Sequence, residues 1–493
     1  MTDQSTAGAP GFRRELKLMD ATLLVIGSMV GSGVFIVSAD IARTLGSGGW
    51  LLAAWLIAGA ITMIGALSYG ELAGMMPHAG GQYVYLRESY NPLVGFLYGW
   101  TLFMVIQTGT IAAVAVGFGK FASVLLPFLS DVVISPGGRD VTGRQLVAIA
   151  VILLLTWINS RGLSGGRLLQ DVFTFAKTAA VLGLILLGVT IGWRHEVFAT
   201  NLAGFWTASW TKVGADGAVT IQALSGVALM AALGVAMVGS LFSSEMWNNI
   251  TFVAGEVVKP KRNLPLALLI GTGAVTLLYL LANVAYIGML PVTGFAEGAD
   301  VAARGIQFAT EDRVATAAAS MIFGEPAALI MAVMIMVSTF GCNNGLILAG
   351  ARVTYAMARD GLFFKRAGTL NQHAVPGAAL WFQAVWASVL CLSGTYGDLL
   401  DYVIFAVLVF YILTVAGLFI LRRKRPDAER PYRAWGYPVL PALYILAAGA
   451  IALDLLIMKP RYTWPGAIIV LLGIPVFFLW RSGQKRPARH RAF

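Results

Sequence analysis

The sequence has little charge and almost no cysteine or histidine. Only 12% of its 493 residues are Asp, Glu, Lys or Arg, about half the share found in soluble globular domains. With a hydrophobic content of 58%, this scarcity of charge excludes a soluble protein. The two cysteines, Cys342 and Cys391, lie in apolar segments, which argues against a disulfide framework. The four histidines are scattered without metal-ligand spacing or a nucleophile–base pair, so we expect no enzyme, metal or cofactor.

What the chain has instead is a series of apolar runs of about 20 residues, each long enough to cross roughly 30 Å of hydrocarbon. We therefore predict an all-α polytopic membrane protein with 12 transmembrane helices. No small-residue cleavage site follows a short apolar core near the N-terminus, so the first run is predicted to be a true span. The predicted spans are 19–43, 50–75, 92–126, 145–162, 168–192, 221–254, 265–290, 326–358, 377–395, 398–422, 438–458 and 464–481.

Basic residues gather on one side of the predicted membrane. With a cytoplasmic N-terminus, 24 of the 35 Lys and Arg fall in cytoplasmic segments, ten lie outside, and Lys177 lies within a span. The positive-inside rule then places both termini in the cytoplasm. The net charge of +11 is thus a topogenic signal that suits anionic lipid, and nucleic acid is not expected as a partner. We expect a multi-pass protein of the plasma membrane, which is the inner membrane in a bacterium.

The first span is rich in residues that disfavour a helix. Residues 26–35 include three Gly and two Ser, and each Gly costs roughly 1 kcal/mol in a helix interior. Residues 31–33 therefore predict a helix that stops and restarts within the membrane, where broken backbone must be buried or line a cavity. The second half would offer N–H groups and a positive dipole to a carboxylate. Alternatively, Gly27 and Gly31 form a Gly-x-x-x-Gly pair that lets two helices pack closely.

The sixth span is too polar at its centre for a helix that faces lipid. Five of seven consecutive residues there are polar: Ser243, Ser244, Glu245, Asn248 and Asn249. An acid in mid-membrane needs a partner, a cavity or a bound cation. Interrupted first and sixth spans stand in equivalent positions if spans 1–5 and 6–10 are repeats, which indicates a midplane site in an inverted-repeat transporter.

A lysine stands near the middle of the fifth span. Lys177 lies about nine residues past Leu168, hence roughly 14 Å into the bilayer. A charge at that depth is a functional candidate because it is costly when unpaired. The alternative is a lysine whose ammonium group lies in the interface. In the eighth span, the hydroxyls of Ser338 and Thr339 either line the same cavity or form hydrogen bonds between helices.

Five motifs together resemble those of the amino acid–polyamine–organocation superfamily of permeases, especially its L-type amino acid transporter branch and bacterial relatives. The likeness covers residues 13 to 482. It implies a LeuT-type fold with spans 1–5 and 6–10 as inverted repeats, helices 1 and 6 broken, and alternating access around a central site. The motifs are Gly-Ser-Gly-Val-Phe in span 1, Pro-x-x-Gly-Gly-x-Tyr-Val-Tyr-Leu after span 2, Trp-Asn-Asn-x-Thr-Phe-Val-Ala-Gly-Glu leaving span 6, Ala-Arg-Val-Thr-Tyr-Ala-Met-Ala-Arg-Asp-Gly after span 8, and Arg-Arg-Lys-Arg-Pro…Arg-Pro-Tyr-Arg after span 10.

The resemblance also implies a set of substrate-binding residues. The N–H groups of residues 31–33 and the Ser32 hydroxyl would bind the substrate carboxylate, and three backbone carbonyls, at residues 29, 242 and 245, would receive the α-amine. Phe242 would cover the substrate as an aromatic gate, and Asn248 would line the site. The full set is Met29, Gly31, Ser32, Gly33, Phe242, Glu245 and Asn248.

By the same resemblance, Lys177 matches a lysine that occupies the place of a sodium ion in sodium-independent members, with Ser338 and Thr339 facing it from span 8. The chain departs from the family pattern at Glu245, where L-type carriers often have a small residue. It also has no Cys in the loop 127–144, so no disulfide-linked heavy chain is expected. The protein would then act as a monomer or weak homo-oligomer.

These inferences predict a sodium-independent secondary transporter of L-α-amino acids that works as an exchanger or a proton-coupled carrier. A neutral substrate is favoured because the candidate pocket residues are mostly apolar or small. The alternatives are a carrier of cationic amino acids or polyamines that uses Glu245, and an amino acid sensor without transport. The predicted domains are a cytoplasmic tail at 1–18, a core of two five-helix repeats at 19–422, a basic loop with two peripheral helices at 423–482, and a cytoplasmic tail at 483–493.

Overall fold

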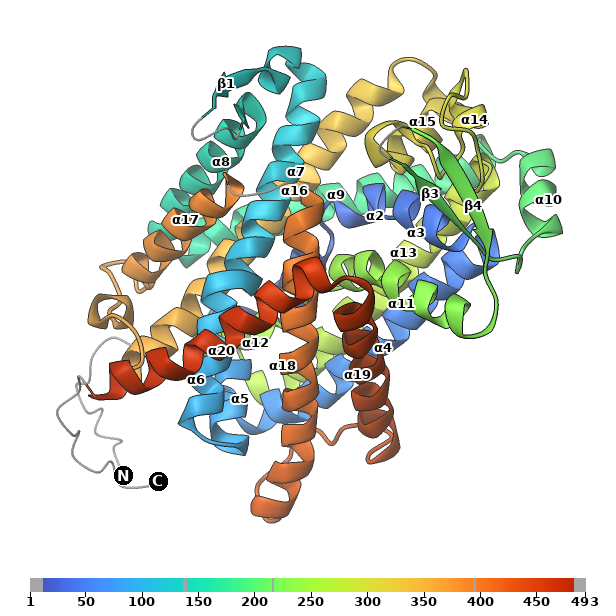
Figure 1. Ribbon diagram of the computed structural model, residues 1–493. Helices are drawn as coiled ribbons and strands as arrows, with labels where there is room; N and C mark the ends of the chain where they lie inside the picture. Colours follow the sequence, from blue (N-terminus) through green and yellow to red (C-terminus); the bar gives the residue numbers. More distant parts are fainter. Residues whose placement is uncertain (1–11, 136–139, 215–216, 393–395, 483–493) are drawn as a thin grey trace.

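The computed structural model describes residues 12–135, 140–214, 217–392 and 396–482 (Figure 1). Most of the predicted tail 1–18 and all of the tail 483–493 lie outside this part of the chain. Eleven helical segments among the described residues are long and apolar enough to span a membrane, which confirms a polytopic membrane protein. They are Leu18–Ile36, Gly48–Met75, Pro92–Leu125, Gly143–Ser160, Gly165–Thr190, Gly226–Ser243, Pro260–Met289, Ala327–Arg359, Val403–Lys424, Val439–Met458 and Thr463–Arg481.

The ninth predicted span, 377–395, corresponds to a shorter helix, α17 (Gly377–Cys391), of 15 residues. Residues 393–395 lie outside the described part, so the total of twelve spans stays a prediction. The other helices are α1 (Leu18–Met29), α2 (Gly33–Ile36), α3 (Ser38–Leu45), α4 (Gly48–Met75), α5 (Gln82–Ser89), α6 (Pro92–Thr101), α7 (Gln107–Leu125), α8 (Gly143–Ser160), α9 (Leu163–Thr190), α10 (His195–Ala203), α11 (Gly226–Ser243), α12 (Asn249–Phe252), α13 (Pro260–Met289), α14 (Val301–Arg304), α15 (Val314–Phe323), α16 (Ala327–Arg359), α18 (Tyr396–Lys424), α19 (Val439–Met458) and α20 (Pro460–Ser482).

Among the described residues, two short antiparallel strand pairs lie between the spanning helices. They consist of β1 (Val132–Ile134) with β2 (Val141–Thr142), and β3 (Ser209–Val213) with β4 (Val219–Ala223). The predicted start of the sixth span at residue 221 was wrong, because residues 219–223 pair with β3 and the helix begins only at Gly226. Figure 1 shows β3, β4, α10, α14 and α15 together at one end of the molecule.

Both predicted interruptions are present. The first helix ends at Met29, and Val30 is extended (φ −75°, ψ 90°) before a new helix starts at Gly33. The sixth ends at Ser243 and restarts at Asn249, with Met246 between them in the left-handed region (φ 67°). A left-handed non-glycine residue costs roughly 1–2 kcal/mol, and such strain is typical of functional sites.

The broken first helix lies at the centre of the bundle. In the most apolar stretch of the first span, Leu18–Ile36, 83% of the residues are buried. In the corresponding stretch of the last span, Thr463–Arg481, only 22% are buried. Around it pack α9, α13 and α16, which come from three distant parts of the chain. Any side chain that points from these three helices toward residues 27–33 is therefore enclosed by protein rather than lipid.

An ion pair between Arg352 of α16 and Glu256 is almost completely enclosed. The Arg352 Nε lies 2.8 Å from Glu256 Oε1, and the side chains are only 1% and 2% exposed. The Glu256 carbonyl also accepts the backbone N–H groups of Glu15 and Leu16 at 2.9 and 3.0 Å. The Glu256 backbone therefore attaches the segment before α1 to the region that follows the second interruption, and the ion pair attaches that region to α16.

Replacing Arg352 with Met should lower the free energy of unfolding by about 3–5 kcal/mol, because it leaves the Glu256 carboxylate buried without its partner. Thermal unfolding of the purified protein in detergent measures this loss. A matched control is Lys261→Met, which removes a surface pair with Glu429 whose side chains are 52% and 72% exposed and should cost at most about 1 kcal/mol. Equal losses in the two variants would contradict a structural role for the buried pair.

Candidate functional site

The carbonyl groups at the end of α1 are bound by side chains from other helices. A helix leaves its last four carbonyls without partners inside the helix, and inside a bilayer water does not supply them. Here a tyrosine of α13 and a cysteine of α16 contact two of these groups, and a serine of α16 contacts the Gly31 carbonyl just beyond the end of the helix. The distances are 3.0 Å from Tyr279 Oη to the Met29 oxygen, 3.1 Å from Ser338 Oγ to the Gly31 oxygen, and 3.1 Å from Cys342 Sγ to the Ser28 oxygen.

Lys177 of α9 completes this set. Its Nζ donates to the carbonyl oxygens of Gly27 at 2.5 Å and Val30 at 2.7 Å. The residue is entirely buried, and within the described part of the chain no carboxylate lies within ion-pair distance of it. Its positive charge therefore lies at the negative end of the α1 dipole. The alternative of a lysine whose ammonium group reaches the membrane interface does not hold.

The close-packing explanation of Gly27 and Gly31 holds at one of the two glycines. A Cβ on Gly27 would lie 1.8 Å from Gln170 Nε2 and 2.5 Å from Thr174 Oγ1, so α1 and α9 approach each other closely there. A Cβ on Gly31 would meet Cys342 Sγ at 3.4 Å, which is ordinary contact. Gly27 thus brings α9, and with it Lys177, against α1, while Gly31 lies within the interruption itself.

The two interruptions lie against each other. A Cβ on Gly33 would lie 2.0 Å from Ser243 Oγ and 3.2 Å from Ser243 Cα, so the start of α2 touches the end of α11. The Tyr279 hydroxyl lies 3.0 Å from the Met29 carbonyl oxygen and 3.1 Å from that of Ser243. One side chain of α13 therefore contacts both broken helices at the points where they end.

Glu245 lies in the second interruption as a buried acid. The residue is 5% exposed, and its Oε1 accepts a hydrogen bond of 2.6 Å from the Tyr411 hydroxyl of α18. Its Oε2 is buried without a hydrogen-bond partner in the described structure, where no Lys, Arg or His lies within ion-pair distance either. The carboxyl group lines two small cavities, one toward Tyr98 and the other toward Tyr444.

Asn248 is held beside this acid by the segment that follows α4. Its Nδ2 donates to Gln82 Oε1 at 2.8 Å, and Gln82 in turn donates to Thr414 of α18 at 3.0 Å.

A π-helical turn at Leu102–Ile106 joins α6 to α7. It closes the cavity between Glu245 and Tyr98, because Leu102 and Ile106 line that cavity. Such turns are frequent at functional sites.

Some predicted residues have other hydrogen-bond partners than expected. The Thr339 hydroxyl bonds to the Ile335 carbonyl of its own helix at 2.8 Å, and that it faces Lys177 stays a prediction. The Phe242 carbonyl accepts the N–H of Glu245 at 3.1 Å, and the Met29 carbonyl is bound by Tyr279. Two of the three carbonyls expected to receive an amine are thus already engaged by protein donors.

Tyr279, Gln82 and Tyr411 were not predicted from the sequence. Each contacts a candidate residue in one of the two broken spans, and each is a single polar side chain within or beside an apolar run. The only signal in the sequence is that a buried tyrosine hydroxyl or amide needs a partner, and this does not say which residue the partner is.

Comparison with known proteins identifies the family. A model of the amino acid permease family matches residues 16–479 of the chain. The chain belongs to this family. Its members are amino acid permeases of the APC superfamily, hence transporters and not enzymes. This confirms the resemblance on which the sequence analysis drew, and the chain is accordingly an amino acid transporter and a multi-pass membrane protein.

The chain is similar over nearly its whole length to several animal transporters. It is 28% identical to the Asc-type amino acid transporter 1 of Homo sapiens over 484 residues, which cover 96% of this chain and 84% of that protein. It is 30% identical to the large neutral amino acids transporter small subunit 2 of Oryctolagus cuniculus over 488 residues, covering 98% and 83%. It is 28% identical to the b(0,+)-type amino acid transporter 1 of Mus musculus over 470 residues, covering 95% and 88%.

Proposed function

We propose that this permease moves neutral L-α-amino acids across the plasma membrane by alternating access, without sodium, as an exchanger or a proton-coupled carrier. The observation that supports this most strongly is the position of Lys177 at the end of α1. The carbonyls of Gly27 and Val30 form a site for a cation, and the lysine supplies that cation as part of the chain. No dissolved ion is then needed to stabilise the interruption.

The same interruption offers a site for the substrate carboxylate. The second half of the broken helix starts at Gly33 and continues through Val37, which is still in the right-handed helical region, to Leu45. Its first N–H groups have no carbonyl partner within the helix, and its positive dipole end favours an anion. Gly31, Ser32 and Gly33 would bind the carboxylate, with Phe242 and Asn248 on the facing helix.

Replacing Ser32 with Val should weaken amino acid binding roughly 10- to 100-fold, because a hydrogen bond to a charged group contributes about 1.5–3 kcal/mol. The substrate-induced rise in melting temperature measures the change. The matched control is Ser388→Val, since in the described part of the chain that hydroxyl bonds only to the Ala384 carbonyl of its own helix. Full affinity in the Ser32 variant would remove residues 31–33 from the carboxylate site.

Glu245 supports a second candidate function, transport of a cationic amino acid or a polyamine. Its buried Oε2 has no partner in the described residues and lies beside the second interruption. A substrate ammonium or guanidinium group would supply this oxygen with a hydrogen-bond donor.

A thermal-shift screen with the twenty amino acids, putrescine and agmatine separates the candidates. Stabilisation by alanine, serine or leucine supports the neutral carrier, and stabilisation only by arginine, lysine or amines would favour the cationic one. Binding without transport in liposomes would indicate a sensor.

Proposals about the assembly follow from the same residues. We place both termini in the cytoplasm, with spans 1–5 and 6–10 as inverted repeats and twelve spans in all.

The name of one relative describes a small subunit, hence a protein with a partner. In this chain both cysteines, Cys342 and Cys391, are buried. They are the only two in its sequence, so a disulfide-linked partner would have no anchor here. We therefore expect a monomer or weak homo-oligomer.

A further inference from the structure

Three glutamates are almost completely buried in the described part of the chain, and two of them have a cationic partner. Glu71 of α4 accepts from Arg422 at 2.6 Å, and Glu256 accepts from Arg352 at 2.8 Å. Glu245, in the second interruption, has no arginine, lysine or histidine of the described residues within ion-pair distance. Of the three, only Glu245 would therefore carry an unpaired charge if it were ionised.

The groups that surround this third carboxyl are uncharged at neutral pH. Among the helices that line the two cavities beside it, α4, α5, α7, α11 and α12 contribute only side chains without a titratable group. Lys177 is bound instead to the carbonyls at the end of α1. The titratable neighbours in the described structure are a thiol and three phenols, which are neutral at pH 7: Cys342 of α16, Tyr98 of α6, Tyr411 of α18 and Tyr444 of α19.

The space beside the Glu245 carboxyl is too small for a substrate. The two cavities that it lines have volumes of about 10 and 20 Å³. One water molecule needs roughly 10–15 Å³ of such space, so neither cavity admits a guanidinium group or a whole amino acid. A proton needs no cavity, so it is the cation that suits this arrangement.

Enclosing this acid is costly unless it is neutral. A glutamate in contact with water is ionised at neutral pH, and burial of a carboxylate without a cation is far less favourable than burial of the protonated form. One oxygen of a neutral carboxyl can accept from Tyr411, as Oε1 does here, while the other carries the proton. The remaining hydroxyl is then a single unsatisfied donor, which costs less than an unpaired charge. The enclosed form of Glu245 is therefore the protonated one.

The contacts of Glu245 join segments that alternating access would move apart. Its backbone belongs to the break between α11 and α12, whereas Tyr411 lies on α18, 166 positions further along the chain. The end of α11 touches the start of α2 at Ser243, so the two broken helices form one unit. A rocking motion of this unit against the surrounding helices would separate Glu245 from Tyr411 and admit water to the carboxyl.

We propose that Glu245 takes up a proton from water each time the carrier closes and returns it each time the carrier opens. Transport then requires the protonated acid and slows as the pH rises. This control rests on the proposed alternating access, and it concerns the rate of closing rather than the binding of the substrate. In exchange, each inward step of the proton is balanced by an outward step, so no net proton movement results.

Counterflow in liposomes with the same pH inside and outside tests this control. The wild-type rate should fall roughly tenfold or more between pH 6 and pH 8.5, because the protonated fraction of an ionised acid falls about tenfold per pH unit. Glu245→Gln is neutral at every pH, keeps an oxygen that accepts from Tyr411 and leaves the backbone unchanged, so its rate should not depend on pH over this range.

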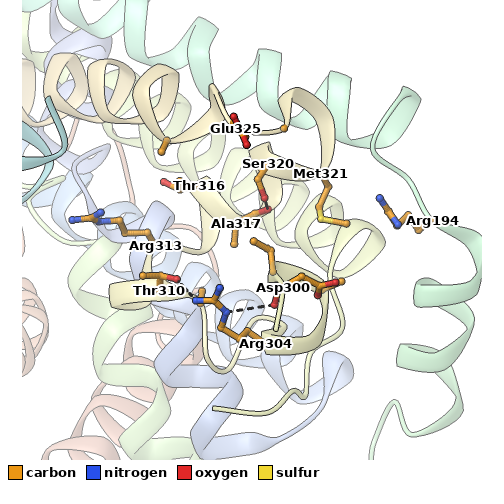
Figure 2. Close-up of a pocket in the computed structure, with 15 residues that line it drawn as sticks. Arg194, Asp300, Arg304, Thr310, Arg313, Thr316, Ala317, Ser320, Met321 and Glu325 are labelled. Carbon is orange, nitrogen blue, oxygen red and sulfur yellow. Dashed lines mark hydrogen bonds between the residues drawn. The ribbon is translucent and has the colours of Figure 1, made fainter. Parts of the chain in front are cut away.

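The matched control is Glu325→Gln. Glu325 is an exposed acid that lines a pocket of about 600 Å³ among α14, α15 and the start of α16 (Figure 2). Because this acid is in contact with water in any conformation of the break, its loss should leave the wild-type pH profile unchanged.

Labelling of Cys342 follows opening without any need for transport. This thiol is buried at the end of α1, 3.1 Å from the Ser28 carbonyl oxygen. In a Cys391→Ser background, its rate of reaction with a water-soluble methanethiosulfonate is measured relative to that of the denatured protein at the same pH. We expect this relative rate to rise several-fold from pH 6 to pH 8.5 with Glu245 and to stay constant with Glu245→Gln.

A wild-type counterflow rate that does not depend on pH would overturn the proposal, as would a Glu245→Gln variant with the wild-type pH profile. If the variant does not transport, Cys342 labelling that ignores pH, or that rises equally in wild type and variant, has the same consequence. Substrate-induced stabilisation and counterflow at pH 6 report on the proposed transport itself. Wild-type protein that transports at pH 6 without the predicted pH dependence would therefore refute the control by Glu245 alone.

Discussion

When Lys177 is replaced by Met, the rate of amino acid uptake into proteoliposomes should fall at least a hundredfold. The substitution keeps the length of the side chain and removes its charge. It leaves the buried carbonyl of Gly27 without its donor and that of Val30 with only the Ser338 hydroxyl at 3.3 Å. An unsatisfied buried group costs about 1–3 kcal/mol. The end of α1 would then lose the geometry on which the interruption depends.

The matched control for this loss is Lys212→Met, which removes a lysine outside the spanning helices that lies over the ring of Trp210. Uptake is compared per amount of monodisperse protein recovered by gel filtration, so that a folding defect is not mistaken for a transport defect. Unchanged uptake by the Lys177 variant between pH 5 and pH 8 would contradict a role for this lysine in transport or in its coupling to protons.

Replacing Gly33 with Ala should also abolish transport, although it adds only one methyl group. The new Cβ would lie 2.0 Å from Ser243 Oγ and 3.2 Å from the Ser243 Cα. Rotation of the serine can relieve the contact with Oγ. The Ser243 Cβ, however, would lie 2.7 Å from the new atom and cannot move without its backbone, so the two broken helices must move apart. We expect at least a tenfold loss of substrate affinity, measured by thermal shift, and a comparable loss of uptake.

A glycine of α9 offers the control. A Cβ on Gly183 would have nothing within 4 Å, so Gly183→Ala should leave transport unchanged and improve helix propensity by up to about 1 kcal/mol. The double variant Gly33→Ala with Ser243→Gly should recover part of the lost affinity, since it removes the Oγ and Cβ of residue 243 and leaves only the 3.2 Å contact with its Cα. Normal transport by the Gly33 single variant would show that the two interruptions need not lie in contact.

Residues 26–35 and 243–249 could be recognised from the sequence because their composition conflicts with their surroundings. Gly and Ser in an apolar run, and an acid among Asn and Ser, predict backbone that is not helical, and the structure has breaks at these places. The position of Lys177 in an apolar run singled it out in the same way, and the structure has this residue entirely buried. Each prediction rests on a local pattern, which is present in the sequence itself.

The contacts between distant helices could not be predicted. Tyr279 and Met29 are 250 positions apart, and no pattern in either segment indicates the other. The intrahelical hydrogen bond of Thr339 could not be predicted for a different reason. A threonine in a helix can bond to the carbonyl four residues earlier, and the sequence does not say whether its hydroxyl does so or contacts another helix. The strand β4 was mistaken for the start of a span because short apolar runs suit a strand as well as a helix.

The most direct test of sodium-independent transport is a counterflow experiment with the purified protein in liposomes. The vesicles are loaded with unlabelled amino acid, chosen from the thermal-shift screen, and labelled amino acid is added outside with all sodium replaced by N-methylglucamine. We predict that label accumulates at the same rate with and without sodium, and that Lys177→Met abolishes accumulation in both buffers. Accumulation that requires sodium, or its persistence in the Lys177 variant, would contradict the role given to the lysine at the end of α1.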